Sequence, residues 1–431
     1  MVSKDNWPMV ADTFPSHIRS VTSGLFLFLV FVVVSLPTGS ILGLNVKVVV
    51  FGGFLAAFTL YLISTRDELS RGEVTFFSVV GGFLCFWSLI GALNGQANSG
   101  QIFYQLREVT SAILIAWLSI FLIRRGLFRP ENLITAVIYG ILFLSAAKLA
   151  LVVATIVSNI DAIEATRSVF GQESLVAGNM AFGLFRMEFS ADILGAFALF
   201  GLLARSVSGI RFGRVLTSVI FVVVLGSGFI AYSRYIWFIY LVSICTAIIV
   251  ERSWKMLSVM VLAALLIGAS SYDVISTVVQ MRFQSDETDS SDIGRVEQAR
   301  ALINEIKARP ILGKGMGAHA NTYTSSDTHL YAYELQWLAF LMQFGLVGGM
   351  GILLLVAASA RDLMAAKHPA KTWILLLFLV WLLASWTNPY LTSSFAGATF
   401  GLFMAMFYRL RNITPNTGSP SMSLVPSFQP R

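Results

Sequence analysis

Apolar segments of nearly constant length recur along the whole chain, and this repetition limits the possible folds more than any other feature. The hydrocarbon core of a bilayer takes about 20 apolar residues of helix. Because 56% of the residues are apolar and only 12% are charged, the chain cannot cover itself with polar surface, and lipid must do so. We therefore expect an all-α, polytopic membrane protein with about 12 transmembrane helices, in which residues 1–431 form a single integral membrane domain. The expected spans are 24–42, 46–64, 74–94, 108–123, 133–157, 189–204, 214–232, 235–250, 255–272, 335–357, 372–387 and 391–407.

The distribution of Lys and Arg predicts the orientation, because short cytoplasmic loops carry the excess of positive charge. With the N-terminus inside, eighteen of these residues fall in cytoplasmic segments and five in outer ones, leaving aside the longest outer loop, whose length removes it from the rule. Both termini are then cytoplasmic, and the two long loops, 159–188 and 273–334, lie outside. The Ser- and Pro-rich tail, 412–431, is expected to be a disordered cytoplasmic segment.

The net charge of +7 does not indicate a nucleic-acid partner, because no basic stripe with interleaved aromatic residues occurs. Cys85 and Cys245 lie inside apolar runs, so we interpret them as buried small hydrophobic residues and not as a disulfide or metal pair. The acidic run 286–292 lacks the spacing and the glycine of a calcium loop, and it is expected to be solvated and mobile. No metal site is predicted.

The longer outer loop has a helical pattern of its own. Asp292 can cap a helix that Pro310 ends, and a Gly-rich stretch, Gly313–Gly317, follows. Such an amphipathic helix could simply lie on the outer membrane surface, and the glycines could serve any tight turn as well as a phosphate. The apolar positions on one face of this helix are Ile293, Val296, Ala299, Leu302, Ile303 and Ile306.

Four outer residues stand beside the expected mouth of the helical bundle: Arg186, Arg234, Arg295 and His329. Arg234 lies between two apolar runs, where removing a guanidinium from water is costly unless an anion or carbonyl groups receive its donors. The alternative is an arginine that extends to the membrane interface. Arginines that converge on one pocket would suit a lipid-linked pyrophosphate, since its oxygens accept forked hydrogen bonds.

His329 is the best candidate for a general base, with His319 as its competitor, although either could be a solvated loop residue. His329 precedes Tyr331–Glu334, which we expect to begin the helix that re-enters the membrane. Glu334 could orient His329 or cap this helix. Lys148 and Asp192 lie inside or near spans and are either functional or paired with each other.

Several of these residues occur in motifs with a familiar order. The chain shows Ser233-Arg234, Gly294-Arg295, a Pro310–Gly317 stretch of the form P-x-x-G-x-G, then Thr328-His329, Tyr333-Glu334 and a G-x-x-G element at Gly345–Gly348. Over roughly 230–350 this pattern resembles bacterial O-antigen and polysaccharide polymerases (Wzy) and the related O-antigen ligases.

The resemblance implies a GT-C-like, metal-independent glycosyltransferase without a cofactor, in the bacterial inner membrane with its active site facing the periplasm. Its donor would be an undecaprenyl-pyrophosphate-linked glycan, and a chain-length regulator protein is a possible partner. By this resemblance Arg234 and Arg295 would hold the pyrophosphate, and His329 would activate the acceptor hydroxyl. The remaining predicted site residues are Glu334 at the catalytic centre and Arg186, Arg167, His319 and Tyr333 at the substrate.

Two alternatives to a polymerase remain open: a ligase that passes the glycan to lipid A-core, and a transporter or flippase. His329 is followed by Leu330 and by Tyr333-Glu334, which resembles the polymerase branch, whereas ligases tend to show a His-Asn pair. Arg167 and Gly178 have the spacing described for the large loops of polymerases, but the longer loop has no such pair. A transporter or flippase would also have about twelve spans with charges inside, yet no related halves are visible in the sequence.

Overall fold

The structure, a computed structural model, describes residues 16–36, 40–41, 44–65, 69–95, 97–158, 164, 176–179, 185–253, 258, 286–326, 329–364, 367–386 and 388–412. The polypeptide is built almost entirely from helices. These are α1 (Ser16–Ser35), α2 (Val46–Thr65), α3 (Arg71–Leu93), α4 (Ser99–Arg124), α5 (Pro130–Ser158), α7 (Asp192–Leu203), α8 (Arg205–Ser208), α9 (Arg214–Ile230), α10 (Arg234–Glu251), α13 (Asp286–Ala308), α14 (Gln336–Met364), α15 (Lys371–Ala384) and α16 (Ser394–Asn412). Two short antiparallel hairpins pair β1 (Ser40–Ile41) with β2 (Leu44–Asn45) and β3 (Val176–Asn179) with β4 (Phe185–Glu188).

Among the described residues, seven helices are long and apolar enough to cross a membrane: α1, α2, α3, α4, α5, α10 and α14. Three shorter apolar helices, α7, α9 and α15, accompany them. Every predicted span overlaps a helix except 255–272, which lies outside the described residues apart from residue 258. The protein is therefore an all-α polytopic membrane protein, as its composition predicts.

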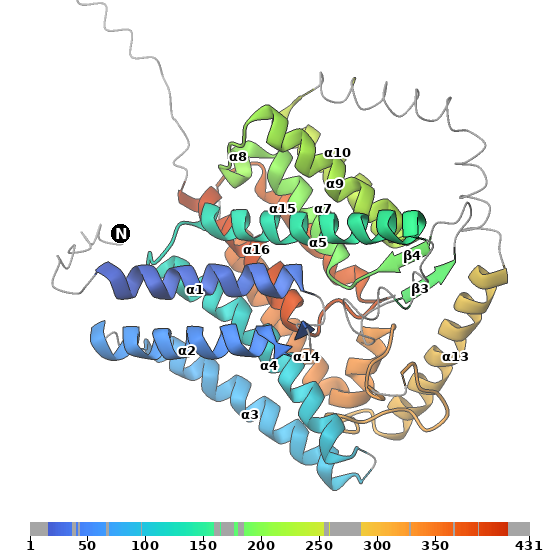
Figure 1. The fold of residues 1–431 in the computed structure, drawn as a ribbon. Helices are drawn as coiled ribbons and strands as arrows, with labels where there is room; N and C mark the ends of the chain where they lie inside the picture. Colours follow the sequence, from blue (N-terminus) through green and yellow to red (C-terminus); the bar gives the residue numbers. More distant parts are fainter. Residues whose placement is uncertain are drawn as a thin grey trace, which may run out of the picture.

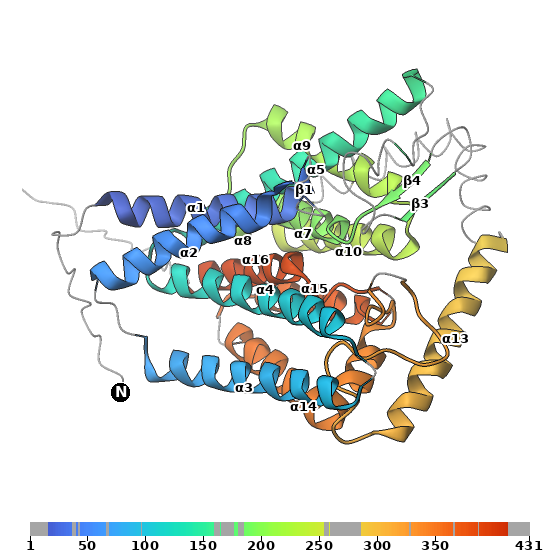
Figure 2. The ribbon, with the colours of Figure 1, turned by 60° about the horizontal axis from the view of Figure 1, so that its bottom comes forward.

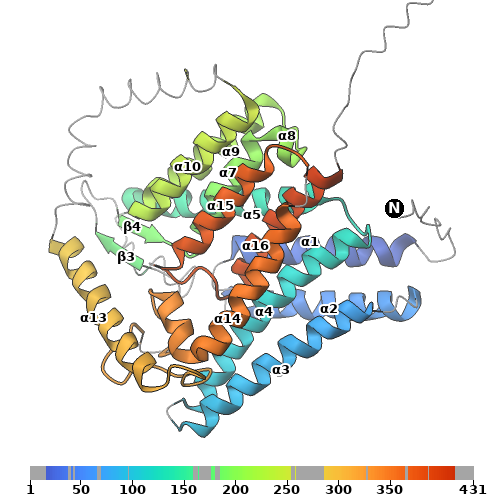
Figure 3. The same ribbon diagram turned by 180° about the vertical axis from the view of Figure 1, so that it is seen from behind.

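The helices pack in layers that are seen most easily in Figure 2. The central α4 runs along α16, α1 packs on α5 and α2, and α3 lies near α14 on the opposite side. Figure 3 shows α4 and α16 side by side from behind. Aromatic rings fill the centre where α7, α15 and α16 meet, with Phe403 packed against Phe197, Phe378 and Trp381. This packing fixes the bundle from which the outer loops extend.

Helix α7 corrects the prediction of a full span at 189–204. Its 12 residues rise about 18 Å, which is short of the roughly 30 Å of a hydrocarbon core. All but the last of them are buried, and the helix packs on α10, α5 and α9. Hydropathy does not distinguish contact with lipid from contact with other helices, so the sequence could not separate a lipid-facing span from this central helix.

The two ends of the bundle gather different parts of the chain. At one end, Arg409 pairs with Glu131 at 2.9 Å and donates to the carbonyl of Ser206, while Arg19 donates to the carbonyl of Gly126. At the other end lie the β3–β4 hairpin and α13, on the right of Figure 1. The segments predicted to share a side of the membrane therefore lie together. The assignment of one end to the cytoplasm stays a prediction from the charge count.

Three local predictions were wrong. Helix α13 begins at Asp286, so the acidic run is helical and Asp292 is not its cap, in keeping with the stability of carboxylates near a helix N-terminus. Helix α14 begins at Gln336, so Tyr331–Glu334 form the turns before it. Cys85 and Cys245 are free, as expected, but exposed on the outside of the bundle, where lipid replaces a protein core.

The predicted tail lies mainly outside the described residues. Asn412 itself belongs to the last turn of α16, and the prediction for residues 413–431 is not tested.

Candidate functional site

The second outer loop folds back on its own helix, and Arg295 takes part in this contact. The Arg295 Nε donates to the Glu334 carboxylate at 2.9 Å, and both side chains are partly exposed, 27% and 46% respectively. One turn further along α13, Gln298 is buried and accepts a hydrogen bond from the backbone N–H of Leu335 at 2.8 Å. The two contacts hold α13 against the segment that leads into α14.

A set of buried glutamines fixes the loop to the membrane helices. Gln105 on α4 donates to Gln343 on α14 at 2.7 Å and accepts from the N–H of Gly317 at 2.6 Å. Gln343 in turn donates to the carbonyl of Tyr331 at 3.0 Å. Gln101 accepts from the N–H of Leu330 at 3.1 Å. An amide can donate and accept at once, so each glutamine joins two segments far apart in the sequence.

The Gly-rich stretch packs tightly against the helices. Gly313, Gly315 and Gly317 all have positive φ, at 69°, 93° and 77°. A Cβ on Gly315 would overlap the backbone of Gly91 on α3, and the N–H of Gly315 donates to the carbonyl of Gln343 at 2.8 Å. This geometry supports the interpretation of these glycines as a close-packed turn, because the loop's backbone donors are used within the protein.

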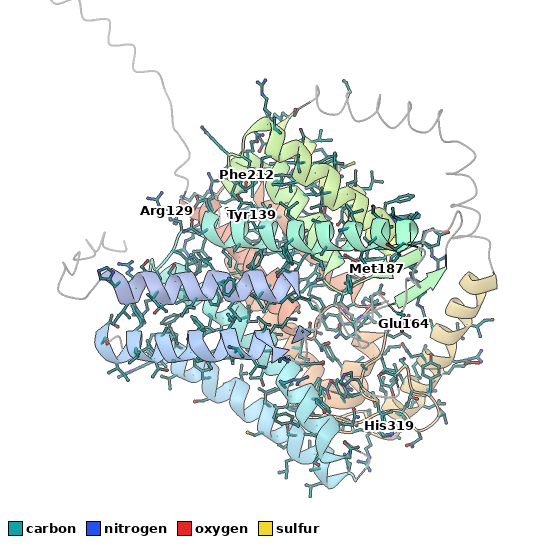
Figure 4. The ribbon with its side chains drawn as sticks, in the orientation of Figure 1. Arg129, Tyr139, Glu164, Met187, Phe212 and His319 are labelled. Atoms are coloured by element: carbon teal, nitrogen blue, oxygen red, sulfur yellow. The ribbon has the colours of Figure 1, made fainter. Side chains whose placement is uncertain are left out.

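Lys314, inside this stretch, forms a buried ion pair with Glu305 of α13 at 2.6 Å. Its Nζ also lies 3.4 Å from the carbonyl of His319. Burial opposes ionisation of Glu305, but hydrogen bonds from Lys314 and the N–H of Asn321 outweigh it and lower the pKa of the carboxyl. Burial and the charge of Lys314 lower the pKa of His319, so its ring is neutral at pH 7. Figure 4 shows His319 in this loop, beside the lower end of α13.

His329 lies on the α4 side of the same loop, between two tyrosines. Its ring centroid is 5.5 Å from that of Tyr104 and 5.7 Å from that of Tyr331. Its backbone N–H donates to Ser326 Oγ at 3.1 Å. Arg107 stands 5.2 Å over the ring of Tyr104. The imidazole is thus held by aromatic contacts at the outer end of α4.

Arg186 and Arg234 belong to neighbouring elements. Arg186 of β4 pairs with Glu188 and places its Nε 3.4 Å from the carbonyl of Ala231, three residues before Arg234. Arg234 is the first residue of α10 and is half-buried. Tyr232, which lies between Ala231 and Arg234 in the sequence, has a φ of 50°. This φ is uncommon for a bulky residue, and it turns the chain sharply from α9 into α10. The predicted break at Ser233-Arg234 is therefore present.

A series of contacts leads from the start of α10, where Arg234 lies, to the start of α14 beside Glu334. Tyr235 follows Arg234, and its ring centroid is 6.4 Å from that of Tyr390. The next residue, Leu391, donates to Gln336 at 2.8 Å, two residues beyond Glu334. The candidate residues thus lie at one end of the bundle in three groups: Arg186 with Arg234, Arg295 with Glu334, and His329 beside Tyr104. Arg167 lies outside the described residues, but Gly178, its predicted partner in spacing, is opposite Arg186 in the hairpin.

Tyr333, a predicted substrate residue, is buried inside the loop. Its side chain is 2% exposed, and its hydroxyl accepts from the N–H of Ala320 and donates to the carbonyl of Tyr323. Burial raises the pKa of Tyr333 to about 12, so the hydroxyl keeps its proton. The residue holds the loop together and does not face an open surface.

Lys148 and Asp192 pair with each other, one of the two possibilities that the sequence left open. Lys148 Nζ lies 2.8 Å from Asp192 Oδ2, and both side chains are buried. The same carboxylate oxygen accepts the N–H of Phe189, so the pair fixes the turn from β4 into α7.

The sequence interpretation missed the glutamines. Their signal was present, since Gln101 and Gln105 are four residues apart, and Gln336 and Gln343 seven apart, on helices that are mostly apolar. Polar amides at helical spacing in an apolar segment mark a face that meets other polar groups, here the backbone of the outer loop.

Comparison with known protein families matches residues 216–353 to the family model Wzy_C, described as O-antigen ligase. The match confirms the resemblance to the O-antigen polymerase and ligase superfamily. The matched segment contains Arg234, Arg295 and His329. No curated protein and no solved structure matches the chain.

Proposed function

We propose, from the match of residues 216–353 to a family described as O-antigen ligase, that this chain is a membrane glycosyltransferase that transfers a glycan from a lipid-linked pyrophosphate. One observation carries the proposal: the matched segment supplies Arg234 at the start of α10, Arg295 on α13 and His329 beside Tyr104 of α4. The proposed location is the bacterial inner membrane, with this end facing the periplasm. The reason is that, with the longest loop left aside, eighteen Lys and Arg lie in the segments at the other side against five at this one.

In the proposed reaction the acceptor is a sugar hydroxyl, and the His329 ring takes its proton. The hydroxyl oxygen then forms a bond to the anomeric carbon of the donor glycan, and the bond from that carbon to the pyrophosphate oxygen breaks. Undecaprenyl pyrophosphate leaves with the bonding electron pair. Arg234 and Arg295 stabilise the negative charge that develops on it, and fixed positive donors of this kind are worth most where water is excluded.

The ion pair with Glu334 suits Arg295 to this role. A guanidinium has five N–H donors, and Glu334 receives the one on Nε. The carboxylate thereby sets the plane of the guanidinium, and a correctly aimed arginine can bind two phosphate oxygens at once. Glu334 is thus a positioning residue in this proposal, and it does not touch the sugar.

The favoured activity is polymerisation, in which the growing chain passes to a new lipid-linked repeat unit. His329-Leu330 and Tyr333-Glu334 support it, since these residues resemble the polymerase branch. The alternative is ligation to lipid A-core. A chain-length regulator is a proposed partner of the polymerase form.

The test is a reaction in proteoliposomes with a defined undecaprenyl-pyrophosphate-linked repeat unit, run with and without a lipid A-core acceptor. A ladder of longer lipid-linked products supports polymerisation, and transfer only when lipid A-core is present supports ligation. Arg295→Ala is expected to lower the rate by about 10²–10³-fold, the usual cost of removing one donor to a developing charge.

Arg300→Ala is the matched control, since Arg300 is exposed on the same helix and outside the three groups. Its rate should stay within about twofold of the unaltered protein, within the small effect of exposed substitutions. Equal losses in both variants would contradict the assignment of Arg295. Movement of the lipid-linked repeat across the vesicle membrane without any transfer would replace the proposal by a transporter.

A further inference from the structure

An open hollow of about 900 Å³ lies at the end of the bundle opposite α13. It is formed where the C-terminal end of α4, the N-terminal end of α5 and the C-terminal end of α16 meet. Arg129, labelled in Figure 4, stands at this end, far from His319 in the outer loop. The hollow is therefore separate from the candidate site for glycan transfer.

Three arginines line the hollow: Arg124, Arg129 and Arg411. No acidic residue lines it in the described part of the chain. Two described carboxylates at this end have partners of their own, since Glu131 pairs with Arg409 and Glu73 lies 3.5 Å from Arg125. The described lining of the hollow is thus positively charged.

Apolar and aromatic groups complete the wall. Ile123 and Phe128 line the hollow, as does Tyr408, whose ring lies 5.7 Å from the guanidinium carbon of Arg124 and whose hydroxyl accepts from Arg124 Nε. These contacts hold one of the three arginines in place. The combination of a fixed guanidinium, two exposed ones and an apolar wall suits a ligand that has a charged head and an apolar body.

The hollow also lies at the depth where such ligands occur. It is at the ends of α4 and α5, both long and apolar enough to cross the membrane, and helix ends of this kind lie at the level of the lipid headgroups. Basic pockets between transmembrane helices bind anionic headgroups, and guanidinium groups match the geometry of phosphate oxygens. We propose that this hollow binds the phosphate of an anionic phospholipid headgroup from the surrounding membrane.

The test is native mass spectrometry of the full chain in detergent, titrated separately with phosphatidylglycerol, phosphatidylcholine and inorganic phosphate. The unaltered protein is expected to retain phosphatidylglycerol about tenfold more tightly than phosphatidylcholine, whose choline group cancels the phosphate charge. Arg129→Gln/Arg411→Gln should lower the affinity for phosphatidylglycerol about tenfold.

The matched control is Arg211→Gln/Arg214→Gln, which removes two exposed arginines from the same predicted side of the membrane but outside the hollow. It should leave the affinity within about twofold, since diffuse attraction alone would fall equally in both variants. A second variant, Arg129→Lys/Arg411→Lys, keeps the charge and should retain most of the binding.

Equal loss in the Gln pair and its control would overturn the proposal. So would binding of inorganic phosphate at the hollow without any preference for phosphatidylglycerol, because the site would then take free phosphate and not lipid.

Discussion

At the end of the bundle where the second long loop lies, the contacts between distant segments are made mostly by amide side chains and ion pairs. Gln105, Gln298 and Gln343 are each at most 2% exposed, and each bridges the loop to a helix or to another glutamine. A buried polar group that lost its partner would cost about 1–3 kcal/mol. Such residues therefore specify one position of the loop, which is what a site assembled from distant segments requires.

The two outer histidines can be told apart by substitution. His329→Gln is expected to lower the rate of glycan transfer by about 10²–10⁴-fold, the contribution of a general base. His319→Gln should lower it less than about tenfold, because that ring lies beside Lys314 and Glu305 in the loop interior. Initial rates in the proteoliposome reaction decide between them. The reverse order would make His319 the base.

Breaking the Lys148–Asp192 pair should be costly, since both groups are buried. Lys148→Met leaves the Asp192 carboxylate without its cation and is expected to lower the free energy of unfolding by about 3–5 kcal/mol. Adding Asp192→Asn should restore most of this loss, because the amide oxygen can still accept from Phe189. Unfolding in detergent micelles measures both. A double variant no more stable than Lys148→Met alone would show that the unpaired Asp192 carboxylate is not the main cause of the lost stability.

At the scale of elements, the hydropathy of a segment does not show which of its faces the fold buries. Helix α7 has the hydropathy of a lipid-facing span but is enclosed by α5, α9 and α10. In helix α13 only part of the apolar face is buried. Leu302 is buried against the loop, whereas Ile293 and Val296 remain exposed. The periodicity correctly predicted a helix in each place, and the neighbours decided which face it would bury.

The turn at Gly315 is the element most sensitive to a single methyl group. Gly315→Ala places a Cβ against the backbone of Gly91 at a φ of 93°, and it should destabilise the loop by about 2–4 kcal/mol. Hydrogen exchange of residues 310–335 should rise accordingly. Gly213→Ala is the control, because its φ of −59° suits alanine and no atom lies within 4 Å of the added Cβ. Similar exchange in the two variants would mean that the close approach is not needed.

At the scale of the whole molecule, the two ends of the bundle carry different chemistry. At one end Arg124 of α4, Arg129 before α5 and Arg411 of α16 line a hollow. At the other end Arg186 contacts the turn before Arg234, Arg295 pairs with Glu334, and His329 lies beside Tyr104. Since the two ends are predicted to lie on opposite sides of the membrane, the proposed lipid binding at one and the proposed glycan transfer at the other need not compete.

The orientation can be tested with a label that does not cross membranes. In a chain with Cys85→Ala and Cys245→Ala, Arg300→Cys is expected to react with an impermeant maleimide added outside intact spheroplasts. Arg211→Cys should react only after permeabilisation, because its segment is predicted to be cytoplasmic. Both residues are exposed, so access to the reagent and not burial decides the result. Labelling of Arg211→Cys from outside would show that the topology is the reverse of the predicted one.

The sequence alone determined the class of the protein, most of its helices and the break before Arg234. These follow from local quantities, namely the length of apolar runs and the position of helix-breaking residues. The order of the motifs also indicated a resemblance to the O-antigen polymerase and ligase superfamily, and the match over residues 216–353 agrees with it.

Only the tertiary structure decided which residues meet. The pairing of Arg295 with Glu334, the burial of Tyr333 and the Lys314–Glu305 pair join segments that are 9 to 39 residues apart, and the Gln105–Gln343 bond spans 238. No local pattern predicts such contacts, because they depend on how several helices pack at once. The same reason explains why the arginine hollow, formed by α4, α5 and α16, was not visible in the sequence.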